Sequence, residues 1–170
     1  NPVVTCPDPE TLVCAEDVPT PNINDVITSD NCLGAVTVTF VKDSVGPGSV
    51  DSICINNKTI YRIYRGTDVC GNDTTCIQQI TINDNIPPAL VGVPNDTTVL
   101  CVELVPAPAT VTATDNCATG AKVIFTADTI NKTCANEMTI RRFYTAMDSC
   151  NNMTLDTMII TVNDTVKPIL

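Results

Sequence analysis

The chain repeats itself once, and this repeat limits the folds it can adopt more than any other feature of the sequence. Segment 93–108 aligns with 6–21, with cysteine and proline at the same offsets in both copies. After a two-residue gap the alignment resumes, and Arg-x-Tyr at 62–64 meets Arg-x-Tyr at 142–144 near the end of each copy. Because a repeated sequence folds as repeated units, we expect two domains, residues 1–86 and 87–170.

Each repeat has the composition and the periodicity of β-strands. Valine, isoleucine and threonine far outnumber leucine and glutamate, and 12 prolines together with many Asn and Asp residues supply turns. Segment 36–41 alternates strictly, 59–68 and 139–148 read as two copies of one strand, and Ile80 and Ile160 are expected to face inward. Short strands with turn-rich connections predict an all-β chain of two tandem immunoglobulin-like β-sandwich domains stapled by disulfides.

The charge and the missing residue types exclude several functions. The net charge is −10 with 9 basic residues, so nucleic acid and anionic membrane surfaces are not expected partners. There is no histidine, which removes imidazole catalysis and histidine metal ligands. No nucleophile elbow or phosphate-cradling glycine loop occurs, so we do not expect an enzyme. No apolar run reaches the length of a membrane span, so membrane insertion by this segment is not expected either.

Ten cysteines without a close Cys-x2-Cys pair predict disulfides, and hence an extracellular location. The first repeat has six cysteines, which allow 15 connectivities, and the second has four, which allow three. If both repeats share one fold, the four common positions pair alike and the two extra cysteines pair with each other. The predicted bridges are Cys6–Cys76, Cys14–Cys54, Cys32–Cys70, Cys101–Cys134 and Cys117–Cys150.

Several motifs together resemble a known family. Cys-Pro-Asp at 6–8, Asp-Asn-Cys at 30–32, and the run from 67–76 into 81–88 resemble the hyaline repeat (HYR-like) modules of cell-surface adhesins from gliding and other Bacteroidota. The resemblance covers both repeats, although the second has Asn151 in place of glycine and lacks the outer cysteine pair. It implies a non-catalytic structural and adhesive module of a long cell-surface stalk or filament.

The resemblance also implies the partners of the chain. They are neighbouring repeats of the same chain, and surface polysaccharide or other cell-surface ligands. The alternative function is a carbohydrate-binding or accessory module of a secreted enzyme. A glycan-binding screen on the isolated pair of repeats separates the two.

Asp followed by Ser or Thr, and then by an aliphatic residue, Met or Thr, resembles the O-glycosylation motif of exported Bacteroidota proteins. The candidate acceptors are Ser44, Ser52, Thr74, Thr97, Thr129, Thr157 and Thr165. The alternative is that these are ordinary turn and strand residues. Asn-x-Thr sequons are also present, and in a eukaryotic secretory protein they would carry the glycans instead. They begin at Asn57, Asn72, Asn95, Asn131, Asn152 and Asn163.

The linker between the repeats resembles a cadherin inter-domain linker, in which Asn-Asp-Asn residues bind calcium. Calcium takes six to eight oxygen ligands from carboxylates, amides and carbonyls. If the loops lie as expected, a candidate calcium site combines Asn83, Asp84, Asn85, Asp115 and Asp148. The alternative is that the aspartates of the Asp-Asn-Cys and Asp-x-Cys motifs cap turns through their own backbone.

Arg62 and Arg142 lie on otherwise apolar strand faces, beside Tyr64 and Tyr144. An arginine on an apolar face is a candidate ligand-binding residue. A guanidinium stacked on the tyrosine, or paired with an Asp at the sheet edge, explains it without a ligand, and we expect this structural role.

Overall fold

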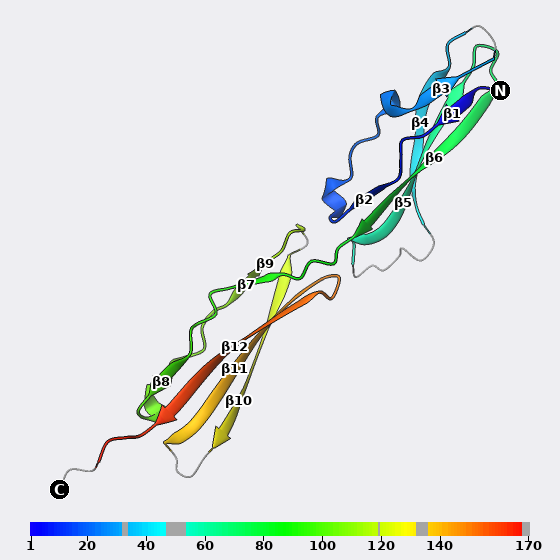
Figure 1. Ribbon diagram of the computed structural model, residues 1–170. Coiled ribbons are helices and arrows are strands. Elements are labelled where there is room, and N and C mark those ends of the chain that lie inside the picture. Colours follow the sequence, from blue (N-terminus) through cyan, green and yellow to red (C-terminus); the bar gives the residue numbers. More distant parts are fainter. Residues whose placement is uncertain (32–33, 47–53, 119, 132–135, 168–170) are drawn as a thin grey trace. The chain divides into compact units, whose positions relative to one another are not determined.

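The chain forms two compact all-β units. The computed structural model describes residues 1–31, 34–46, 54–118, 120–131 and 136–167, and this part of the chain contains no α-helix. The units are Asn1–Asn85 and Ile86–Leu170, so the division falls one residue before the expected boundary. Unit 1 runs from blue to green in Figure 1, and unit 2 from green to red.

The described residues of unit 1 form a four-stranded sheet and a two-stranded sheet. The large sheet has the order β2-β6-β5-β4, in which β2 is parallel to β6 and the other neighbours are antiparallel. The small sheet pairs β1 with β3. The strands are β1 (Val3–Thr5), β2 (Glu10–Leu12), β3 (Ile27–Ser29), β4 (Thr37–Val45), β5 (Asn57–Thr67) and β6 (Asp73–Asn83). Two 3₁₀ turns, η1 (Ala15–Asp17) and η2 (Ile23–Asp25), lie between β2 and β3.

Unit 2 repeats this strand order. Its large sheet is β10-β11-β12-β8, with β8 parallel to β12, and its small sheet pairs β7 with β9. The strands are β7 (Ala89–Val91), β8 (Thr97–Val99), β9 (Thr112–Thr114), β10 (Ala121–Asn131), β11 (Glu137–Asp148) and β12 (Met153–Asn163). Between β8 and β9, where every residue is described, there is one 3₁₀ turn, η3 (Val102–Leu104).

Period-two alternation builds the core of each unit. Ile80 of β6 and Ile160 of β12 are both 0% exposed, so the predicted inward positions are confirmed. On the neighbouring strands Tyr64 and Tyr144 are each 1% exposed. Burial of one such side chain contributes about 1.5–3 kcal/mol, so these few positions supply much of the stability of a small unit.

The small sheet of unit 1 lies against the large sheet at Gly66 of β5. A Cβ atom at Gly66 would lie 2.6 Å from Cγ2 of Val4 and 3.0 Å from Cγ1 of Val36. A side chain therefore does not fit there unless its neighbours move. Unit 2 has Ala146, which is 0% exposed, at the equivalent position. A small residue at this place lets the two sheets approach closely.

Edge strand β4 contains an irregularity that its counterpart β10 does not have. The pairing of β4 with β5 shifts register at Val41, which is an extra residue in the ladder. Such a bulge reverses the alternation of side chains beyond it. Asp43 consequently comes opposite Arg62. The pairing of β10 with β11 continues without a shift and places Ala127 opposite Arg142.

Candidate functional site

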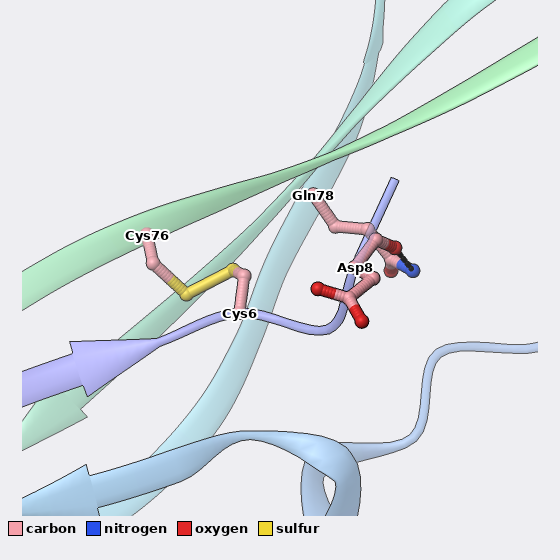
Figure 2. Close-up of a disulfide and its surroundings, with 4 residues drawn as sticks. All are labelled: Cys6, Asp8, Cys76 and Gln78. Carbon is pink, nitrogen blue, oxygen red and sulfur yellow. Dashed lines mark hydrogen bonds between the residues drawn. A yellow bond between two sulfur atoms is a disulfide. The ribbon is translucent and has the colours of Figure 1, made fainter. Parts of the chain in front are cut away.

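A disulfide connects the N-terminal segment of unit 1 to its last strand. Cys6 and Cys76, the pair predicted from the repeat, form an S–S bond of 2.04 Å with their Cα atoms 5.6 Å apart. Figure 2 shows the bond next to a second tie between the same segments, in which Nε2 of Gln78 donates to the carbonyl of Asp8 at 3.2 Å. The N-terminal segment is thus held to β6 covalently and by hydrogen bonding.

Further cysteines are disulfide-bonded in both units. They are Cys14, Cys54, Cys117 and Cys150. Together with Cys6 and Cys76 they make three disulfides in the described part of the chain. Both members of the predicted pairs Cys14–Cys54 and Cys117–Cys150 are therefore in bonded form. Disulfides persist in oxidising compartments, so this content indicates an oxidising environment outside the cytosol.

Each of the two other predicted bridges has one cysteine in the described residues, and that cysteine is a free thiol. Cys70 is a free, exposed thiol and Cys101 a free, half-buried one. Their predicted partners, Cys32 and Cys134, lie outside the described residues. The predictions of Cys32–Cys70 and Cys101–Cys134 assumed that aligned positions bond alike in both repeats. Bonding also requires the two Cα atoms to lie within about 7 Å, which the local loop conformation decides separately in each unit.

The Asp-x-Cys-x-Asn motif forms the same turn in both units. Oδ1 of Asp68 accepts hydrogen bonds from the main-chain N–H groups of Cys70 and Asn72, each at 2.9 Å. Its Oδ2 accepts from the side-chain amide of Asn72 at 2.8 Å. Asp148 accepts the three equivalent hydrogen bonds in unit 2, each at 2.8 Å. Both carboxylates thus cap turns, which is the alternative to calcium binding that the sequence left open.

This turn also explains a sequence difference between the repeats and a shifted pKa. Gly71 has φ 85° and Asn151 has φ 66°, so the position requires the left-handed region that Gly and Asn tolerate best. The hydrogen bond from the Asn72 side chain, helped by the main-chain N–H groups of Asn72 and Cys70, lowers the pKa of Asp68 below its ordinary value of 3.8.

The predicted calcium ligands come from both units, and a site that joins them stays a prediction. Unit 1 supplies exposed Asn83 and Asn85 and buried Asp84, and unit 2 supplies Asp115 and Asp148. Asp115 fits a cation ligand, because its Oδ1 is buried without a hydrogen-bond partner while Oδ2 accepts from the N–H of Cys117 at 3.3 Å. Asp148 fits less well, because its carboxylate already accepts three hydrogen bonds.

The candidate O-glycosylation acceptors differ in accessibility. Thr129 and Thr165 are exposed, whereas Ser44, Thr74, Thr97 and Thr157 are half-buried, and Ser52 lies outside the described residues. The aspartates of the motif have structural partners wherever they are described. The pairs are Asp43 with Arg62, Asp73 with Arg65, Asp96 with Ile159 N–H, Asp128 with Arg141, Asp156 with Thr157 N–H, and Asp164 with Val166 N–H. These contacts account for the aspartates without modification, and glycosylation stays a prediction.

Arg62 and Arg142 occupy equivalent buried positions but bind different partners. Arg62 is 3% exposed, and its Nε and Nη2 donate to the two carboxylate oxygens of Asp43 at 3.0 and 2.9 Å. The hydrogen bond to Asp43 raises the pKa of Arg62 above its ordinary value. Arg142 is 6% exposed, and its Nη2 and Nη1 donate to the carbonyls of Pro106 and Ala107 at 2.6 and 3.2 Å. The expected Asp partner at the sheet edge is therefore correct for Arg62 only.

An asparagine in each unit, buried in unit 1 and half-buried in unit 2, escaped the sequence analysis. Asn56 is 0% exposed; its Oδ1 accepts from Ala15 N–H at 2.8 Å and its carbonyl from Asp84 N–H at 2.9 Å. Asn136 makes the same two contacts in unit 2, with the first N–H of η3 at 3.3 Å and with Asp164 N–H at 3.1 Å. Each asparagine therefore fastens a 3₁₀ turn to the end of the last strand. The available signal was a Cys-x-Asn sequence shared by the repeats.

In the part of the chain that the structure describes, no helix is long and apolar enough to cross a membrane. Function has to be inferred from the two units themselves, because comparison with protein-family models and with curated proteins finds no match.

Proposed function

We propose that the chain is an extracellular structural and adhesive repeat module, part of a long cell-surface stalk or filament, without catalytic activity. In this proposal each unit is an immunoglobulin-like sandwich of the hyaline-repeat type, and its nearest partners are neighbouring repeats of the same chain. The common strand order of the two units and the three disulfides in their described residues support it.

The Cys6–Cys76 disulfide is the observation that carries this proposal. Its cysteines are 70 residues apart in the sequence, yet their Cα atoms are 5.6 Å apart. A force applied to the two ends of unit 1 therefore passes from the N-terminal segment through the S–S bond into β6. Residues 7–75 lie outside that path, so tension cannot extend them while the bond is intact.

The hydrogen-bond pattern adds a second resistance to extension, which acts in unit 2 and, once the Cys6–Cys76 bond is reduced, in unit 1. A short strand near the start of each unit pairs parallel with the last strand, β2 with β6 and β8 with β12. When the N-terminal end of one strand and the C-terminal end of its parallel neighbour are pulled apart, the force acts along both strands. The hydrogen bonds between them are then sheared together and do not open one at a time. This geometry suits a protein held in tension between a cell and a surface.

Single-molecule force spectroscopy tests the proposal on the 170-residue chain, pulled from its two ends. We expect residues 7–75 to contribute no length when unit 1 yields in its oxidised form. After reduction, extension of this segment should add up to about 240 Å of contour length, at about 3.5 Å per residue. Oxidised and reduced traces with equal length gain would contradict the proposed force path.

A double variant and the second unit provide the controls. Without any reductant, Cys6→Ala with Cys76→Ala should extend further than the oxidised parent protein but less than the reduced one, because Cys14 and Cys54 remain disulfide-bonded. Unit 2 has Val93 and Asp156 at the equivalent positions, so removal of the Cys6–Cys76 bond should leave its unfolding length unchanged. A change in both units would mean that the variant had altered more than the force path.

A further inference from the structure

A cavity of about 460 Å³ lies between the β2–β3 connection and the large sheet of unit 1. Arg62 and Tyr64 of β5 and Gln78 of β6 line it on the sheet side, and Pro19, Pro21 and Asp25 line it on the connection side. Its volume falls in the range of ordinary ligand sites. Three buried side chains face it from two strands, whereas most of its other lining residues are exposed, so the cavity is open to solvent on the side of the connection.

Arg62 brings hydrogen-bond donors to this cavity. A guanidinium has five N–H groups, and Arg62 uses one on Nε and one on Nη2 to bind Asp43. The side chain is only 3% exposed, and Tyr64 also hydrogen-bonds its guanidinium. These contacts leave two of the five N–H groups for an acceptor in the cavity that Arg62 lines.

Unit 2 shows which acceptor a guanidinium at this position takes. Arg142 donates to two consecutive main-chain carbonyls, those of Pro106 and Ala107, in the segment Val-Pro-Ala-Pro. The equivalent segment of unit 1, at 19–20, makes no hydrogen bond with Arg62. The place that the chain's own backbone fills in unit 2 is therefore open in unit 1.

Two differences between the repeats account for the open cavity. The bulge in β4 brings Asp43 opposite Arg62, whereas Ala127 lies opposite the arginine of unit 2. The β2–β3 connection, residues 13–26, is two residues longer than its counterpart, residues 100–111, and contains the additional turn η2. Asn22 stabilises that turn, because its Oδ1 accepts from Asn24 N–H at 3.2 Å and its Nδ2 donates to Asp25 at 2.9 Å.

We propose that this cavity binds an extended, proline-containing peptide segment through two consecutive main-chain carbonyls at Arg62. Proline pre-sets the extended conformation, leaves the carbonyls free to accept hydrogen bonds, and lowers the entropy cost of binding. Carboxylates of Glu10 and Asp25 line the same cavity, so the segment has no acidic side chains. The site does not depend on the proposed stalk function.

The chain itself supplies the probe for a test. The acetylated and amidated peptide Leu-Val-Pro-Ala-Pro-Ala, the sequence of residues 104–109, is titrated into the oxidised 170-residue protein and followed by NMR. We expect saturable shifts of the Arg62 Nε–H and the Gln78 side-chain amide, with no shift at Arg142, which is already satisfied. The absence of shifts at peptide concentrations of about 10 mM would overturn the proposal, because even a Kd of about 1 mM would be detected.

Variants that close the cavity complete the test. Asp43→Ala copies unit 2, releases Arg62 to the carbonyls of its own connection, and should weaken peptide binding at least tenfold. Asp128→Ala removes an exposed arginine partner in unit 2 and should leave binding unchanged. Unchanged binding by a folded Asp43→Ala protein would overturn the proposal.

An accessible cavity residue provides a variant that does not disturb the core. Thr20 is exposed and lines the cavity, so Thr20→Trp should fill the cavity and abolish binding, whereas Thr20→Ser should retain it. Methyl glucoside and inorganic phosphate are titrated separately. If the Arg62 and Gln78 signals shift with one of these compounds and not with the peptide, the ligand of the cavity is a sugar or an anion. That result would refute the proposed peptide site.

Discussion

Single residues decide whether the Asp-x-Cys-x-Asn turn can form. The turn needs one residue with positive φ and one carboxylate that accepts three hydrogen bonds, and both units meet these needs with different residues. The sequence identified the motif because it recurs. It did not distinguish a turn cap from a calcium ligand, since both uses require an aspartate at the same position.

Substitution at Gly71 tests the requirement for positive φ. Gly71→Ala should destabilise unit 1 by about 1 kcal/mol, because an L-residue with a Cβ is disfavoured in the left-handed region. Gly71→Asn should cost less, since Asn151 adopts φ 66° at the equivalent position. Urea unfolding of both variants measures the difference, and equal losses would show that φ is not the cause.

The lowered pKa of Asp68 predicts a specific dependence of stability on pH. The folded state holds this carboxylate ionised more strongly than the unfolded chain does. Its contribution is therefore complete above the ordinary pKa of 3.8 and is lost as the pH falls through the lower folded value. Carboxyl ¹³C NMR should find the Asp68 midpoint below 3.8. In Asn72→Ala, which lacks the side-chain donor, the midpoint should rise, and an unchanged midpoint would exclude Asn72 as the cause.

Strands and their connections differ between the units more than the sequence pattern suggests. Alternation predicted the strand at 36–41, and β4 does begin at Thr37, but the extra residue Val41 interrupts it. Hydrophobic alternation does not reveal a bulge, because the register of a strand depends on the partner strand. The bulge nevertheless decides that Asp43 lies opposite Arg62. This pairing is one reason why the cavity beside Arg62 is open.

The contact between the small and large sheets gives a prediction at Gly66. Gly66→Ala should destabilise unit 1 by about 1–3 kcal/mol, because the added methyl group overlaps Val4. Shortening the neighbour with Val4→Ala should recover part of the loss in the double variant. The opposite change in unit 2, Ala146→Gly, serves as the matched control and should also destabilise, through lost burial and added chain entropy. Additive effects of Gly66→Ala and Val4→Ala in thermal unfolding would contradict direct contact.

At the scale of the whole molecule, the two units share a strand order but differ in their cross-links. Only unit 1 has the Cys6–Cys76 bond, because unit 2 has Val93 and Asp156 at those positions. A bond across 70 residues restricts the unfolded chain strongly. The two units should therefore respond differently to reduction.

Calorimetry of the double variant Cys6→Ser, Cys76→Ser tests this difference. The chain-entropy relation for a loop of this length gives a loss of about 4 kcal/mol for unit 1, as an upper value. The transition of unit 2 should not move. If the transitions of both units shift equally, the bond does not act on unit 1 alone.

Calcium is tested by the melting temperature in the presence of calcium and of a chelator. If calcium binds the folded chain, the midpoint should rise with calcium concentration and fall on chelation. Asp115→Asn should reduce the response, since a buried oxygen of Asp115 has no hydrogen-bond donor. Asp68→Asn, which alters a turn outside the predicted ligand set, is the control. If the chelator leaves the melting midpoint unchanged, the folded chain does not bind calcium.

The sequence by itself determined the repetition, the inward positions of the last strands, the Cys6–Cys76 pair and the position of the Asp-x-Cys turns. These features depend on local periodicity, or on a comparison of one repeat with the other. Only the tertiary structure decided which partner each buried arginine takes and which aligned cysteines are bonded. Those outcomes depend on strand register and on loop conformation, and a bulge or a two-residue insertion changes both while most of the hydrophobic pattern remains the same.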